Sequence, residues 1–112
     1  MQIMISSEGE NLESKPSLRF GRAPYFIKYN LEEGTWEALK NPATDQRGGA
    51  GVKAAQIIID HNITHVLSGQ FGPNARQALS AAGLRLITFD GKYISVNEVI
   101  KAFKNNDLIE EE

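Results

Sequence analysis

Short apolar runs alternate with polar, glycine-bearing segments along the chain, and the spacing of the apolar positions differs from run to run. Some runs are continuous or alternating and favour strands, with aromatic and β-branched residues and turn residues at their ends. These predicted strands cover residues 2–6, 25–30, 35–39, 65–68 and 84–89. Other segments place apolar residues three and four apart, which favours helices. These predicted helices cover residues 52–61 and 73–82, and a third begins at Ser95.

Several helix boundaries have recognisable end signals. Pro73 is suited to the first position of a helix, and Ser95 with Glu98 has the spacing of a capping box. Asn62 suits the left-handed conformation that often follows a helix, and Gly83 ends the second helix. The element order is therefore β-β-β-α-β-α-β-α.

This order predicts a single α/β domain over residues 1–105. The second and third strands form a hairpin, and the later β-α-β units imply parallel strands with right-handed crossovers. The result is a mixed five-stranded sheet in the order 3-2-1-4-5, with strand 2 antiparallel and three flanking helices. That order resembles the ribonuclease H-like architecture. We expect the acidic residues 106–112 to form a disordered tail.

In this topology, three glycine-bearing loops meet at the carboxyl edge of the sheet: residues 8–24, 41–51 and 69–72. Open α/β sheets bind ligands at such edges, where connections leave in opposite directions. Two predicted helices begin there, and their free N–H groups and dipoles favour an anion. The basic residues on or near this edge are Arg19, Arg22, Arg47, Lys53 and Arg76.

We therefore predict an anion-binding crevice, with one structural alternative. Glycines also end strands and begin helices in proteins that bind nothing, and Arg22 could pair with Glu8 or Glu10. The candidate binding residues are Arg19, Phe20, Gly21, Arg22, Arg47, Gly48, Gly49, Gly51, Gly69, Gly72 and Asn74.

The amino-acid composition of the chain excludes several classes of binding partner and cofactor. The 112 residues have a net charge of −2, which argues against a general nucleic-acid-binding surface. The chain has no cysteine, so thiolate-held zinc and iron–sulfur sites are excluded. No apolar run approaches the roughly 20 residues that span a membrane, and the first residues do not resemble a signal peptide. We expect a cytoplasmic protein with neither nucleic acid nor membrane as a partner.

No arrangement of residues predicts an active site. A two-metal nuclease needs several carboxylates close together. Here Asp60 lies near the end of the first predicted helix, Asp90 follows the last predicted strand, and the first strand has no acidic residue, so these carboxylates do not converge. His61 and His65 end a helix and begin a strand, so a capping or surface role is favoured over metal ligation. GGAGVK lacks the Walker spacing, and Ser68 has no histidine partner at its edge. We predict no catalytic residue and no metal ligand.

Three motifs in order carry a family resemblance: RFGRAPYF, NPATDQRGGAGVKAAQ and SGQFGPNARQALSAAGLRL. Together they resemble the dinitrogenase iron–molybdenum cofactor biosynthesis family over nearly the whole chain. The resemblance implies a ribonuclease H-like fold without nuclease activity. It also implies non-covalent binding of an iron–molybdenum–sulfur or related metal–sulfide cluster, or of its precursor, with cluster-assembly proteins as partners.

Such clusters are anionic, so arginines and backbone N–H groups can hold them. The resemblance places Arg19 where nitrogenase-linked members often carry a histidine that can serve as a cluster ligand. The expected function is a non-enzymatic carrier or binding protein for this cluster. The alternative is a regulatory or interaction domain that binds a phosphate-bearing small metabolite at the same crevice.

Overall fold

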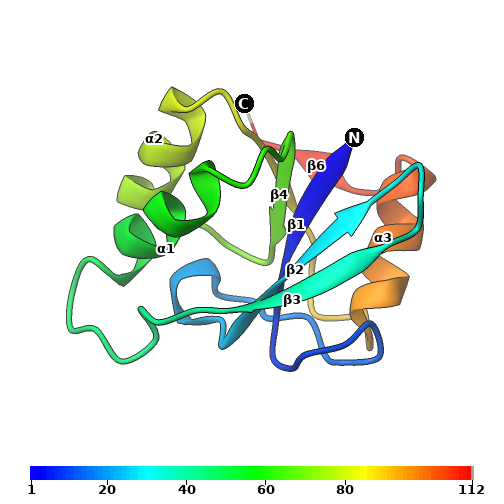
Figure 1. The fold of residues 1–112 in the computed structure, drawn as a ribbon, viewed down its shortest axis with the longest axis horizontal. Helices are drawn as coiled ribbons and strands as arrows, with labels where there is room; N and C mark the ends of the chain where they lie inside the picture. The colour runs from blue at the N-terminus through cyan, green and yellow to red at the C-terminus, as the bar shows by residue number, and fades with distance from the viewer. Residues whose placement is uncertain (112) are drawn as a thin grey trace.

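The computed structural model of the chain describes residues 1–111 as one mixed β-sheet with α-helices on both faces (Figure 1). The elements are β1 (Gln2–Ser7), the 3-10 helix η1 (Phe20–Arg22), β2 (Tyr25–Asn30), β3 (Trp36–Lys40), α1 (Ala50–Ile59), β4 (His65–Ser68), α2 (Pro73–Ala81), β5 (Arg85–Thr88), α3 (Val96–Lys104) and β6 (Ile109–Glu110). The predicted order of strands and helices is confirmed, with η1 and β6 added.

The strands lie in the order β3-β2-β1-β4-β5-β6. Strand β1 is at the centre, where it pairs antiparallel with β2 and parallel with β4. Strands β4 and β5 are also parallel, and β2 and β3 form the predicted hairpin. The predicted order 3-2-1-4-5 and the antiparallel strand 2 are therefore confirmed, and the sheet has six strands instead of five.

The sixth strand differs from the expectation of a disordered tail over residues 106–112. Ile109–Glu110 pairs antiparallel with β5, and Glu111 N donates to the Leu86 carbonyl at 2.8 Å. The acidic composition suggested a solvated segment. However, β5 would otherwise be an edge strand with unpaired backbone groups, and this segment satisfies them. Glu112 lies outside the described residues.

The two faces of the sheet have separate apolar cores. Helices α1 and α2 cover one face and α3 covers the other (Figure 1). Neighbouring residues of β1 point to opposite sides, so that Met4 packs under α1 and α2, whereas Ile3 and Ile5 pack under α3. This arrangement buries β1 and β4 on both sides and leaves their carboxyl ends as the place where loops can gather.

The three α-helices within residues 1–111 begin in two different ways. Helix α3 has the predicted cap: the Ser95 hydroxyl accepts from Glu98 N at 3.1 Å, and the Glu98 carboxylate accepts from Ile94 N at 3.1 Å. Helices α1 and α2 begin after Gly49 and Gly72, and no side chain of the described residues caps either one. None of the described helices is long and apolar enough to cross a bilayer.

Candidate functional site

A pocket of about 250 Å³ lies where η1 meets the N-termini of α1 and α2. It is at the carboxyl edge of the sheet, and it receives residues from all three of the predicted loops. Its lining residues are Arg19, Phe20, Gly21, Arg22, Gly49, Ala50, Gly51, Gln70 and Gly72. We call this the glycine pocket.

Two glycines allow the walls of the glycine pocket to approach each other. A Cβ atom on Gly21 would lie 2.9 Å from both Cα and N of Gly51. A Cβ atom on Gly51 would in turn lie 3.1 Å from the Cβ of Ala75 in α2. Glycine at these two positions therefore lets η1 and α1 pack backbone against backbone, and lets the Ala75 side chain of α2 approach α1 closely.

The glycine pocket is bordered by helix ends whose first N–H groups lack a side-chain cap. Gly48 and Gly49 precede α1 with φ angles of +67° and +72°, in the left-handed region that favours glycine. Gly72 precedes α2, and Pro73 takes the first helical position as predicted. The first N–H groups of a helix have no partner within the helix, and they carry the positive end of its dipole. Two such ends beside one pocket favour an anion.

The two arginines of the pocket have different surroundings. Within residues 1–111, the exposed guanidinium of Arg19 makes no hydrogen bond or ion pair. Arg22 is also exposed, but its Nη1 donates to the carbonyl oxygens of Thr44 and Gln46 at 2.9 and 2.7 Å. Arg22 therefore holds the loop of residues 41–49 against η1, and Arg19 is the available cation at the pocket.

The sequence analysis did not identify Asn41, a buried residue whose side chain also holds the 41–49 loop in place. Asn41 is 1% exposed, its Nδ2 donates to the Ala23 carbonyl at 2.8 Å, and its Oδ1 accepts from Ala43 N at 3.0 Å. The sequence did contain a signal for this residue, because an Asn-Pro pair after a strand favours the start of a turn. Gln70 was also missed; its carbonyl accepts from Phe20 N at 3.1 Å and joins the third loop to η1.

Some of the candidate residues lie elsewhere. Arg47, Gly48, Gly69 and Asn74 do not line the glycine pocket. Gly69 packs against the preceding loop, because a Cβ atom there would lie 2.6 Å from the Cα of Leu18. Phe20 lines the pocket but is buried, and its ring packs against the rings of Phe26 and Phe71 at centroid distances of 5.2 and 5.3 Å. Arg76 pairs with Glu111 at 2.7 Å.

The donor atoms of residues 1–111 do not provide a metal-binding group of the usual kind. Within residues 1–111, no three His, Cys, Asp or Glu side chains lie close enough together to hold a metal ion. The glycine pocket instead carries positive charge: the Arg19 guanidinium, which pairs with no group in the described residues, and the first N–H groups of two helices. This arrangement can hold an anion by charge and hydrogen bonding, and it supplies no nucleophile or general base.

The chain is similar to proteins of known structure along almost its whole length. The family model for the dinitrogenase iron–molybdenum cofactor matches residues 1–106. The apo form of the orange protein from Desulfovibrio gigas superposes with a TM-score of 0.92 at 29% identity, covering 98% of this chain and 92% of that one. A protein from Thermotoga described as a putative NifB protein gives a TM-score of 0.85 at 36% identity, covering 97% and 91%. No functionally curated protein matches the chain.

Proposed function

Because this chain belongs to the dinitrogenase iron–molybdenum cofactor family, we propose that it is a non-enzymatic carrier of an anionic metal–sulfur cluster. The cargo is an iron–molybdenum–sulfur cluster, a related metal–sulfide cluster or a precursor of one. It binds non-covalently at the glycine pocket. The observation that supports this most directly is that one pocket is bordered by two helix N-termini and by Arg19, none of which has a side-chain partner within residues 1–111.

The chemistry of the pocket fits such a cargo. The sulfide ligands of an anionic cluster accept hydrogen bonds from N–H groups, and the cluster charge is stabilised by a guanidinium and by helix dipoles. The chain has no cysteine, and residues 1–111 gather no group of other metal-ligating side chains. The cluster is then held by electrostatics alone, which suits a carrier that must release it to a cluster-assembly protein.

The side chains of the pocket have distinct parts in this proposal. Arg19 contacts the charge of the cluster, because its guanidinium is exposed and pairs with no group in the described part of the chain. Arg22 keeps the 41–49 loop in place through Thr44 and Gln46. The N–H groups that follow Gly49 and Gly72 donate to the cargo at close range.

Metal retention tests the carrier function. The protein is mixed without oxygen with iron salt and tetrathiomolybdate and passed through a desalting column, and metal per protein is measured in the eluate. We expect stoichiometric retention by the wild type and loss in Arg19→Ala. Arg47→Ala is the matched control, because Arg47 is exposed nearby but does not line the pocket. No retention by folded wild-type protein contradicts the carrier function; equal loss in both variants contradicts the site.

The second candidate is a domain that binds a phosphate-bearing metabolite in the same pocket. It is favoured by the same pair of helix N-termini, because backbone N–H groups at helix ends are also a common phosphate site. A thermal-shift panel separates the two functions. A nucleotide or sugar phosphate that raises the melting temperature at low concentration, without metal retention in the first experiment, supports the second candidate.

A further inference from the structure

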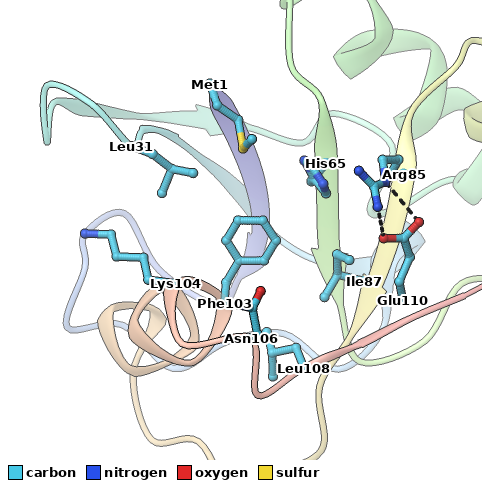
Figure 2. A pocket seen from close by; sticks show the side chains of 10 residues that line it. All are labelled: Met1, Leu31, His65, Arg85, Ile87, Phe103, Lys104, Asn106, Leu108 and Glu110. Atoms are coloured by element: carbon cyan, nitrogen blue, oxygen red, sulfur yellow. Dashed lines mark hydrogen bonds and ion pairs between the residues drawn. The ribbon is translucent and has the colours of Figure 1, made fainter.

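One edge of the sheet is closed by the chain itself. Strand β6 covers β5, and Arg85 of β5 pairs with Glu110 of β6, with Nε and Nη2 of the arginine at 2.9 and 2.6 Å from the two carboxylate oxygens (Figure 2). The outermost strand on this side, β6, is only two residues long. A very short edge strand offers another chain little backbone to pair with.

The same ion pair lines a second pocket, of about 480 Å³, at the end of the sheet where β1, β4 and β5 begin (Figure 2). His65 also lines this pocket and is 5% exposed, so the predicted surface or capping role is wrong for this histidine. Its Nδ1 lies 2.7 Å from Oγ1 of Thr64. These polar side chains are therefore engaged within the chain.

The opposite edge of the sheet, formed by β3, is open. Within residues 1–111, β3 pairs with β2 alone, and it does so over all five of its residues without a bulge or a proline. The single tryptophan of the chain, Trp36, lies on this strand and is 40% exposed. A regular edge strand of this kind presents unpaired N–H and C=O groups that can pair with another strand.

The hydrogen bonds at the two ends of β3 show which of its backbone groups face outward. The Thr35 carbonyl accepts from β2 at 2.8 Å, and Asn41 N donates to the residue before β2 at 2.9 Å. Because alternate residues of an antiparallel strand bond to the same side, the odd-numbered residues bond to β2. Trp36, Ala38 and Lys40 therefore direct their N–H and C=O groups away from the sheet.

These outward groups fit a second copy of the same strand. In a dimer with a two-fold axis the two β3 strands run antiparallel, and outward groups must lie opposite outward groups. When Ala38 lies opposite Ala38 of the second copy, Trp36 lies opposite Lys40 of that copy. Every outward N–H and C=O of the three residues then has a partner, and no like charges lie directly opposite each other.

The neighbouring registers are less favourable. A shift of the pairing towards the start of the strand places Glu37 opposite Glu37 of the second copy, and facing like charges are destabilising. A shift towards the end places Trp36 opposite Pro42, which has no N–H to donate. The chain therefore specifies one register, centred on Ala38.

The side chains favour a second copy over an unrelated strand. A lysine on an edge strand usually opposes pairing with other chains, and Lys40 is such a lysine. In the register centred on Ala38, however, each Lys40 faces the exposed ring of Trp36 from the other copy. An ammonium group is attracted to the face of a tryptophan ring, so the lysine stabilises this pairing alone.

We propose that β3 pairs antiparallel with β3 of a second copy and forms a reversible dimer with one continuous sheet. Each copy supplies five strand residues, against about 20–30 residues a side in a standard interface, so the dimer is weak. No residue of β3 lines the glycine pocket, so this interaction is separate from the carrier function.

Sedimentation equilibrium of the full-length protein tests the dimer and its register. We expect the wild type to associate as its concentration rises towards millimolar, and Trp36→Lys to associate roughly tenfold more weakly, because two cation–π contacts become lysine–lysine pairs. The double variant Trp36→Lys, Lys40→Glu restores opposite charges and should recover the association. Ile94→Lys is the matched control, because Ile94 is 74% exposed and lies outside β3.

Three results would overturn the proposal. A wild type that remains monomeric at millimolar concentration excludes the dimer. Equal association of Trp36→Lys and Ile94→Lys excludes β3 as the interface, and failure of the double variant to recover excludes the assigned register. Metal retention at the glycine pocket should be the same in Trp36→Lys as in the wild type, so the dimer and the carrier function fail separately.

Cross-linking provides a second test that leaves the facing pair intact. The chain has no cysteine, so Ala38→Cys introduces a single thiol at the centre of the strand. We expect a short thiol cross-linker to trap this variant as a dimer. Glu13→Cys is the control, because Glu13 is exposed and lies outside β3. Equal trapping of the two variants contradicts pairing through β3.

Discussion

Gly21 and Gly51 pack backbone against backbone across the glycine pocket, and a Cβ atom on Gly21 would lie 2.9 Å from the Cα of Gly51. The contact joins η1 to the first turn of α1. Neither neighbour is a flexible side-chain end that could move away. The shape of the pocket therefore depends on the absence of a side chain at residue 21.

The first prediction is that Gly21→Ala destabilises the protein. The added methyl group forces η1 and α1 apart, and we expect a loss of about 1–3 kcal/mol in the free energy of unfolding, as for overpacked sites. Gly72→Ala is the control, because nothing lies within 4 Å of a Cβ atom there and the φ angle is −68°. Urea unfolding of both variants checks this, and equal stabilities would show that the close contact relaxes freely.

The second prediction concerns Arg22 as a tether. Arg22→Ala removes the bonds to the Thr44 and Gln46 carbonyls, so we expect faster amide hydrogen exchange in residues 43–49. The stability loss should be about 0.5–1.5 kcal/mol. Arg19→Ala should leave exchange in this loop unchanged, since the Arg19 side chain makes no such bond. Unchanged exchange in Arg22→Ala would mean that Asn41 alone holds the loop.

The third prediction follows from the lowered pKa of His65. The folded state binds this proton less readily than the unfolded state, whose pKa is near 6.5. The contribution of His65 to stability is therefore complete above pH 6.5 and decreases as the pH falls towards the folded-state pKa. The groups facing His65 are Arg85 and Glu110. Urea unfolding between pH 7.5 and 5 should show this decrease, and His65→Leu should reduce it. The same slope in both proteins would exclude His65 as its source.

The fourth prediction concerns the sixth strand. Deleting residues 109–112 should lower the melting temperature, because β5 loses its backbone partner and the Leu86 carbonyl loses the bond from Glu111 N. Glu110→Gln should change it much less, because an exposed ion pair contributes little. Thermal unfolding of the two variants decides between strand pairing and ion pairing. A larger effect of Glu110→Gln would contradict the backbone argument.

Local patterns were sufficient for the framework of this fold. Apolar runs and end signals such as Pro73 and the Ser95–Glu98 cap act over a few residues, so they can be read without tertiary contacts. Short connections and right-handed crossovers then leave few sheet orders to choose from. The same reasoning placed the three glycine loops at one edge, and the glycine pocket lies there.

Other features depend on which distant segments meet. The partners of Arg22 belong to a loop more than twenty residues away, and the pairing of β6 with β5 depends on an open sheet edge. No local pattern distinguishes Gly51, which lines the glycine pocket, from Gly69, which packs on Leu18.

The sequence by itself determined the strands, the helices, the order of the first five strands and the edge at which the loops gather. Only the tertiary structure decided which glycines and which arginines line the glycine pocket, and that His65 is buried beside a second pocket. The physical reason is the distance along the chain over which each interaction acts. Periodicity and capping involve neighbouring residues, whereas burial and hydrogen-bond partners arise from packing between segments that are remote in the chain.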